Sequence, residues 1–198
     1  MALTAEEFAA FEALVIEPTA KRELQCRSYL VHAEHLLIEK TLRSTVQHIE
    51  VRSYMGDADL ILAADVLNDT GQSERVAFLW ELKAPQCHLF EYDDNKHRCR
   101  PTLDLVKAEN QLLHYVDEAV ANENVRNRLG VPLRANIRPG GIIIGTQKSL
   151  LRAPKNARDI EKAATALRLR QERFYSAQGI RILLWDRVLD AVRPTSII

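Results

Sequence analysis

A short apolar segment, residues 76–83, constrains the fold of this chain most strongly. Its sequence is Val-Ala-Phe-Leu-Trp-Glu-Leu-Lys, and Ala84-Pro85 follow it directly. A run of this length, with aromatic residues and a proline stop, predicts a buried strand rather than a helix. Strand side chains alternate between two faces, so Glu81 and Lys83 point one way and Leu82 the other. A carboxylate and an ammonium group thus share one face at the strand's end, which on its own is typical of a salt bridge.

Two further strands are predicted immediately before this segment. Residues 45–54 carry recurring apolar side chains whose spacing favours a strand, and residues 58–67 are almost entirely apolar, as expected for a strand covered on both faces. Only short polar stretches, residues 55–57 and 68–73, separate the three strands. Sequential strands with links this short form an antiparallel meander, and residues 76–83 are its third strand.

Helical patterns surround the meander. Apolar residues at helical spacing predict helices over residues 4–17, 19–39, 102–124 and 157–178, and short strands are predicted at 140–145 and 180–185. Residues 86–101 are polar and aperiodic, so a long loop is expected there. At 198 residues with 46% hydrophobic content, we expect a single domain in which residues 1–18 are an N-terminal helical extension. The predicted fold class is α/β, with a mixed central sheet flanked by helices.

The sequence predicts a cytoplasmic protein with reduced thiols. No apolar run reaches the length of a membrane span, and the N-terminus lacks the basic and apolar regions of a signal peptide. Cys26, Cys87 and Cys99 are few and odd in number, which favours free thiols over a disulfide framework. Two of them belong to the pattern Cys87-His88…His97-x-Cys99, whose spacing favours a polar loop over a zinc site. We expect no membrane partner.

Charge is distributed unevenly along a chain whose formal net charge is zero. Residues 1–125 contain 12 Lys and Arg against 22 Asp and Glu, whereas residues 126–198 contain 15 against 5. One interpretation is that the two parts neutralise each other in the fold. The other is a basic face for a polyanion, beside an acidic site that needs cations to approach one. The arginines of residues 158–173 fit either the path of such a polyanion or a solvated helix face.

Three charged side chains interrupt the apolar strands at one edge of the meander. Asp59 opens the second strand, and Glu81 and Lys83 close the third. In a hairpin-connected pair, the start of one strand lies beside the end of the next, so these side chains are expected to converge. Carboxylates are ligands that Mg²⁺ and Mn²⁺ prefer, and such a metal can polarise a phosphate and lower the pKa of bound water. The ammonium group would orient that water or offset charge on the phosphoryl oxygens.

The order and spacing of these residues resemble the signature of the PD-(D/E)xK nuclease superfamily. Asp59 is followed by 21 residues and then by Glu81-Leu82-Lys83, and the restriction-endonuclease-like core of that superfamily has the same αβββαβ order. Residues 111–115, Gln-Leu-Leu-His-Tyr, resemble the Gln-x-x-x-Tyr motif of its RecB-like branch. More narrowly, four segments spread over residues 20–192 are similar to the nuclease domain of Shedu anti-phage defence proteins: Glu23-Leu24-Gln25, residues 80–85, residues 141–145 and residues 181–189.

The resemblance implies a metal-dependent DNA endonuclease in anti-phage defence. Asp59 and Glu81 would bind Mg²⁺ or Mn²⁺, with the Leu82 carbonyl as a further oxygen ligand, and Lys83 would assist the attacking water. The proline that often precedes the first aspartate is an alanine here, which leaves Asp57 as a rival ligand. We favour Asp59, because in this superfamily the aspartate usually leads directly into the apolar strand. DNA is the expected partner, and the sequence leaves open whether the chain forms a homo-oligomer.

Three further residues receive roles from the resemblance. Gln111 and Tyr115 would hold the site or the DNA backbone, and Glu23 would be an outer contact to the metal. Since Gln111 and Tyr115 are four residues apart on one helix face, their spacing is also typical of a buried tyrosine whose hydroxyl bonds to a neighbouring glutamine. The alternative function is a non-catalytic nucleic-acid-binding module that keeps the nuclease fold.

Overall fold

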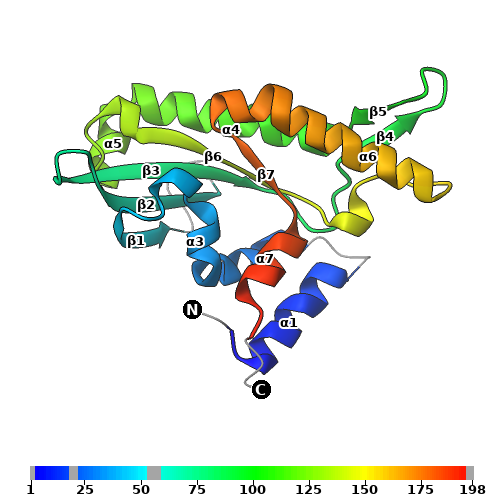
Figure 1. The fold of residues 1–198 in the computed structure, drawn as a ribbon, viewed down its shortest axis with the longest axis horizontal. Helices are drawn as coiled ribbons and strands as arrows, with labels where there is room; N and C mark the ends of the chain where they lie inside the picture. The colour runs from blue at the N-terminus through cyan, green and yellow to red at the C-terminus, as the bar shows by residue number, and fades with distance from the viewer. Residues whose placement is uncertain (1–2, 18–21, 53–58, 195–198) are drawn as a thin grey trace.

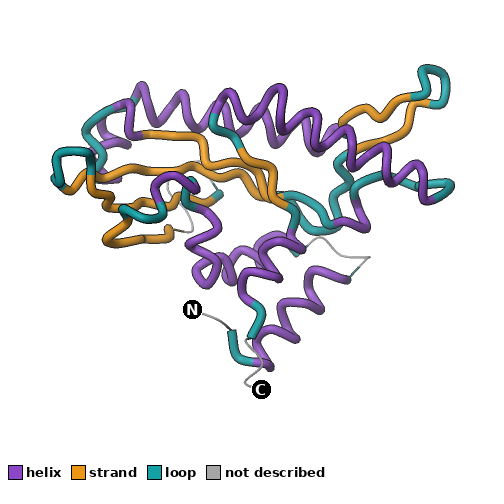
Figure 2. The backbone as a smooth tube through the Cα atoms, viewed as in Figure 1, coloured by secondary structure: helices purple, strands orange, loops and turns teal. Residues whose placement is uncertain are grey.

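The computed structural model describes residues 3–17, 22–52 and 59–194, and a five-stranded sheet forms its centre (Figures 1 and 2). In spatial order the strands are β1 (Val46–Arg52), β2 (Leu60–Leu67), β3 (Ser73–Leu82), β6 (Ile137–Ile143) and β7 (Arg181–Leu183). The first three are antiparallel, whereas β6 runs parallel to β3 and β7 runs parallel to β6. The predicted meander within a mixed sheet is therefore confirmed.

Helix α4 (Leu103–Ala121) lies on the connection from β3 to the parallel strand β6. It begins at Thr102, whose hydroxyl accepts a hydrogen bond from the Leu105 amide at 3.3 Å, as expected of an N-cap residue. Its buried residues recur every three or four positions and form the predicted stripe: Leu105, Ala108, Leu112, Tyr115 and Ala119. After α4 the chain continues through α5 (Glu123–Leu129), which ends at Gly130 with a φ of 71°.

The sheet separates two hydrophobic cores. Side chains of β3 alternate between them: Ala77 and Leu79 belong to the core that includes α4 and α6 (Ala157–Arg170), as the side-chain period of a strand requires. Phe78 and Trp80 belong to the other core, with α1 (Ala5–Ile16) and α7 (Trp185–Val192). Figure 1 shows α4 and α6 above the sheet and α1 and α7 below it. The molecule is thus a mixed α/β structure with helices on both faces of its sheet.

Helix α1 is part of the lower core. Its first turn has the predicted N-cap at Thr4, which forms a capping box with Glu7. Phe11 is fully buried, stacks on Tyr29 with ring centroids 4.4 Å apart, and meets Trp185 edge to face at 6.2 Å. The N-terminal helix expected as an extension therefore packs on the same sheet as the rest of the chain.

The prediction of a long loop over residues 86–101 is wrong for most of this segment, where the structure has a hairpin. β4 (Phe90–Asp93) pairs with β5 (Arg98–Pro101), and the hairpin projects beyond the main sheet (Figure 2). The Phe90 amide donates to the Leu150 carbonyl at 2.9 Å, and the Arg152 amide donates to the Phe90 carbonyl at 2.8 Å. This anchoring comes from a distant segment, so the local polarity of the sequence did not indicate strands.

The long helix predicted over residues 19–39 is broken in the structure. Its described part consists of α2 (Glu23–Arg27), a 3₁₀ segment (Ser28–Ala33) and α3 (Glu34–Leu37). The Arg181 guanidinium of β7 donates to the carbonyls of Leu36 and Ile38, at 2.9 and 3.1 Å. The last carbonyls of a helix have no partner within the helix, so these bonds stabilise the end of α3.

The C-terminal elements also differ in extent from their predictions. Helix α6 continues as a π-helical turn over Gln171–Tyr175 and a 3₁₀ turn over Ser176–Gln178, so the helix predicted to residue 178 is regular only to Arg170. The last strand is only three residues long, and α7 begins at Trp185, inside the predicted strand. None of the described helices is long and apolar enough to span a membrane.

Candidate active site at the end of the central strand

Asp59 and Glu81 lie next to each other across the β2–β3 ladder. Leu60 is paired with Trp80, and continuing this register by one residue places Asp59 opposite Glu81. The Leu82 amide donates to Asp59 Oδ2 at 3.0 Å, which ties the aspartate to the end of β3. The structure therefore brings together the two carboxylates that the sequence predicted to converge.

Lys83 completes this group. Its ammonium group contacts Glu81 Oε1 and donates to the Leu82 carbonyl at 3.1 Å. The main chain of Lys83 is held on both sides, since its amide donates to Ile143 O at 2.8 Å and its carbonyl accepts a hydrogen bond from Trp185 Nε1 at 2.8 Å. Strand β6 and helix α7 thus fix the position from which the lysine side chain projects, and the sequence did not indicate the contribution of Trp185.

Glu81 is fully buried, which is unusual for a carboxylate. Burial is the largest effect on this group and raises the pKa of Glu81 to about 8. The contact with Lys83 lowers the pKa but offsets only part of this effect, and the neighbouring Asp59 raises it further. At neutral pH, without a metal, Glu81 is therefore largely protonated.

The donor set at this position fits a hard divalent cation. Glu81 Oε2 is buried and has no hydrogen-bond partner among the described residues, although a buried polar atom normally has one. A cation bound to this oxygen, to Asp59 and to the Leu82 carbonyl would supply the missing partner, with water completing the coordination shell, as Mg²⁺ prefers. Within the described residues, no group of three or more His, Cys, Asp or Glu side chains is arranged to hold a metal, so a site here depends on the carbonyl and water.

Gln111 and Tyr115 meet each other on α4. Gln111 Nε2 donates to the Tyr115 hydroxyl at 3.3 Å; the glutamine is exposed, whereas the tyrosine belongs to the upper core. With Asn110 and His114 they line a shallow hollow on the outer surface of the helix. The observed pair is the arrangement expected of a buried tyrosine bonded to a nearby glutamine, and their role in holding DNA stays a prediction.

Helix α2 reaches the candidate site through a residue that the sequence analysis missed. Arg27 Nη1 donates to the Asp59 carbonyl at 3.3 Å. Arg27 lies four residues after Glu23 on the same helix face, and this spacing was the available signal. The role of Glu23 as a metal contact stays a prediction, and the rival ligand Asp57 lies outside the described residues.

The cysteines and histidines of the zinc-like pattern are distributed over different elements. Cys87 and His88 precede β4, and His88 Nδ1 lies 3.2 Å from the Ser149 carbonyl oxygen. His97, with a φ of 51°, stands at the turn of the hairpin, and Cys99 lies in β5. All three cysteines are free thiols.

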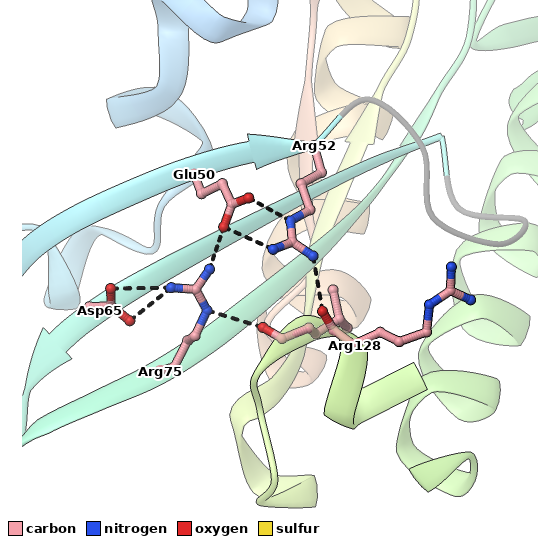
Figure 3. A network of polar contacts seen from close by, with 6 residues as sticks. Glu50, Arg52, Asp65, Arg75 and Arg128 are labelled. Carbon is pink, nitrogen blue, oxygen red and sulfur yellow. Dashed lines mark hydrogen bonds and ion pairs between the residues drawn. The ribbon is translucent and has the colours of Figure 1, made fainter. Parts of the chain in front are cut away.

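A second charged group lies on the same sheet face, farther from the candidate site (Figure 3). Glu50 of β1 and Asp65 of β2 both bind Arg75 of β3, and Glu50 also pairs with Arg52 at 2.7 Å. Arg75 Nε and Arg52 Nη1 donate to the Leu129 and Arg128 carbonyls at the end of α5, at 3.0 and 3.1 Å. The Arg52 guanidinium holds the pKa of Glu50 below its usual value. This network joins β1, β2 and β3 to the end of α5, so we interpret it as structural.

No model of a known protein family matches the chain, and no curated protein is significantly similar to it in sequence. The function therefore has to be argued from the site itself.

Proposed function

We propose that this protein is a metal-dependent endodeoxyribonuclease of the PD-(D/E)xK superfamily. The observation that carries the proposal is the fully buried Glu81, which lies opposite Asp59 and contacts Lys83, and of which one oxygen has no hydrogen-bond partner in the described part of the chain. The order of elements supports it: a helical segment, three antiparallel strands, α4 and the parallel strand β6 follow one another, with the β4–β5 hairpin inserted before α4. This order is compatible with the restriction-endonuclease-like αβββαβ core that the motif resemblance implies. The resemblance of the four short segments to Shedu nuclease domains favours a role in anti-phage defence, in the cytoplasm.

The residues at the end of β3 would divide the work of phosphodiester hydrolysis. Asp59, Glu81 and the Leu82 carbonyl would hold Mg²⁺ or Mn²⁺, which lowers the pKa of a bound water and polarises the phosphate. Lys83 donates hydrogen bonds from a partly buried position, where it can orient water and offset the negative charge that develops on the phosphoryl oxygens. Gln111 and Tyr115 would hold the DNA backbone or the site, and Glu23 would be an outer metal contact.

Cleavage of supercoiled plasmid DNA tests the proposal. We expect nicking by the wild-type chain in Mg²⁺ or Mn²⁺ and none in chelator. Lys83→Ala and Glu81→Gln should each lower the rate by about 100-fold or more, as for the loss of an electrostatic or acid–base group. Lys40→Ala is the control, because Lys40 is exposed and lies outside the site. Equal cleavage by wild type and Lys83→Ala under all metals would show that the assignment is wrong.

The alternative is a nucleic-acid-binding module without turnover. The contacts of Lys83 with Glu81 and with the Leu82 carbonyl favour it, because they engage two of the expected metal ligands. This alternative predicts salt-sensitive DNA binding that survives Glu81→Ala, with no nicking in any metal.

A further inference from the structure

A surface cleft of about 480 Å³ lies between the β4–β5 hairpin and α6. The hairpin contributes His97, Arg98 and Cys99 to its lining. Helix α6 contributes side chains three or four positions apart, and therefore on one helix face, among them Arg158, Glu161, Lys162 and Thr165. Its walls belong to two elements that are far apart in the sequence.

The cleft contains positive charge that the surrounding acids leave unneutralised. The acidic side chains nearby already have cationic partners: Glu91 pairs with Arg100 at 2.9 Å, Asp94 with Lys155 at 2.8 Å, and Asp159 with the lining residue Lys162 at 3.6 Å. Arg98 and Arg158 are exposed and form no ion pair within the ranges that the structure describes. Glu161 is the one carboxylate among the lining residues, so the two unpaired guanidinium groups outnumber it.

Both walls of the cleft are anchored to the body of the molecule. The hairpin is held through Phe90, as described above, and its turn is closed by Asp93 Oδ1, which accepts from the Asn95 and Lys96 amides at 3.1 and 3.2 Å. The far end of α6 is held to α4, because Arg170 donates to Glu109 Oε1 at 2.8 Å. A cleft between anchored elements presents its charges in a constant arrangement, which lowers the entropic cost of binding.

The cleft and the candidate active site belong to the same side of the sheet. Glu81 alternates with Leu82 along β3 and so shares a face with Leu79, which packs in the core of α4 and α6. Helix α6 borders the cleft, so the cleft and the side chain of Glu81 both lie on the side of the sheet opposite α1 and α7.

The remaining arginines of this helical segment are less suited to bind a ligand. Arg168 pairs with Glu172 at 3.0 Å, and Arg170 is engaged with Glu109 and with the Tyr175 hydroxyl. Arg173 is exposed but is not among the residues that line the cleft. The sequence left open whether the arginines of residues 158–173 bind DNA or lie on a solvated helix face. Among those described, Arg158 is the one that lines the same cleft as Arg98.

We propose that this cleft binds the phosphate backbone of duplex DNA through Arg98 and Arg158, away from the reaction centre. Guanidinium groups bind phosphate oxygens in a bidentate manner, and contacts of this kind position a duplex without reading its sequence. The open shape of the cleft suits a continuous chain that passes through it. The identity of the ligand rests on the proposed function, whereas the cleft and its charges do not.

The test is binding of a short fluorescent DNA duplex by anisotropy, over a series of salt concentrations. Binding is measured once in chelator, for the metal-free protein, and once in Ca²⁺, for the metal-bound protein, so that the DNA stays intact in both. Arg98→Ala/Arg158→Ala should weaken binding about tenfold or more and reduce the salt slope by about two, since two phosphate contacts are lost. Arg98→Lys/Arg158→Lys should keep the slope but bind less tightly, because lysine retains the charge without the bidentate geometry.

The matched control is Arg128→Ala/Arg134→Ala. It removes the same charge from exposed residues of α5 and the following 3₁₀ turn, and Figure 3 shows the Arg128 side chain directed away from the Glu50 network. This control should bind DNA with the wild-type affinity and slope. If both double substitutions weakened DNA binding equally, the loss would reflect net charge alone and the proposal would be wrong. Tighter binding of duplex RNA than of duplex DNA to the cleft would also overturn it.

Different experimental results would contradict the cleft proposal and the nuclease proposal. If the wild-type chain cleaves plasmid DNA and Arg98→Ala/Arg158→Ala binds the duplex as tightly as wild type, the cleft proposal is wrong and the active site stands. If no metal supports cleavage but binding depends on Arg98 and Arg158, the cleft proposal is supported and the nuclease assignment is wrong. Absence of duplex binding by wild type in chelator and in Ca²⁺ would overturn the cleft proposal.

Discussion

Glu81 combines three properties that are rarely found together in a residue of purely structural role. It is fully buried, one of its oxygens finds no hydrogen-bond partner in the ranges that the structure describes, and a second carboxylate lies opposite it. The Lys83 ammonium group lowers the pKa of Glu81, but burial raises it by more. Strong perturbation by burial together with specific charged partners is typical of functional sites.

The raised pKa of Glu81 predicts a pH-dependent stability for the metal-free protein. The folded state has a pKa of about 8 at this group and the unfolded state the ordinary value of 4.5, so the folded state binds the extra proton between these values. The contribution to stability is therefore fully present below pH 4.5 and is lost as pH rises to about 8. Chemical denaturation in chelator should show a free energy of unfolding that falls across this window.

Glu81→Gln should remove this part of the pH dependence, since an amide does not titrate. Glu118→Gln, an exposed position on α4, is the control and should keep the wild-type profile. Addition of Mg²⁺ should stabilise the wild-type chain most at the upper end of the window, where Glu81 is ionised, by binding the folded state. Parallel profiles for wild type and Glu81→Gln in chelator would contradict the assigned pKa.

At the scale of elements, the edge strand β7 is protected by a side chain. Gln171, in the π-helical turn after α6, donates from Nε2 to the Ile180 carbonyl and accepts at Oε1 from the Ile182 amide, both at 3.0 Å. One amide group thus makes the two hydrogen bonds that a neighbouring strand would make. Free strand edges are sites of unwanted association, so this contact both stabilises β7 and closes the sheet at that edge.

We expect Gln171→Ala to destabilise the fold by about 1 kcal/mol and to expose the β7 edge to association. Urea denaturation measures the first effect, and the sedimentation of the protein at increasing concentration measures the second. Gln178→Ala, an exposed glutamine in the following 3₁₀ turn, should change neither. A monomer of unaltered stability after Gln171→Ala would show that β7 does not depend on this side chain.

At the scale of the whole molecule, one sheet supports two cores. Leu62 and Phe78 contribute to the lower core, while Ile61 and Leu79 on the same strands contribute to the upper one. Loss of packing in either layer therefore acts on strands that both layers need. This coupling is the physical basis for expecting the chain to unfold as one unit.

Phe11→Ala tests this coupling from the N-terminal helix. Removal of a fully buried phenylalanine from the lower core should cost about 3–5 kcal/mol in free energy of unfolding. Because the cores share strands, amides of α4 in the upper layer should lose protection from hydrogen exchange as well. Ile16→Ala is the control, since Ile16 is mostly exposed on the same helix. Unchanged protection of α4 would indicate two independent folding units.

The charge asymmetry of the sequence is only partly resolved by internal pairing. Several ion pairs join the acidic first part to the basic last part, as the neutralisation interpretation expects: Arg138–Glu39, Arg152–Glu91, Lys155–Asp94 and Arg170–Glu109. Within the described residues, Arg98 of the first part and Arg158 of the last part form no ion pair and line the same cleft. Internal pairing is therefore present, whereas a basic face for a polyanion stays a prediction.

The sequence alone determined the elements whose patterns are local. The meander of β1 to β3 follows from short apolar runs with polar links, and the buried stripe of α4 follows from helical spacing. The convergence of Asp59 with Glu81 also follows, because a hairpin fixes which strand ends meet. Each of these predictions needs information from residues close together in the chain.

Only the tertiary structure decided what depends on distant partners. Arg181 bonds to the carbonyls at the end of α3 from more than 140 residues away, and contacts of residues 150–152 with Phe90 anchor the hairpin in a segment predicted to be a loop. The burial that raises the pKa of Glu81 comes from packing on both sides of β3, and the cleft arises where α6 passes the hairpin. Such contacts have no local periodicity, so they become visible only once the chain is folded.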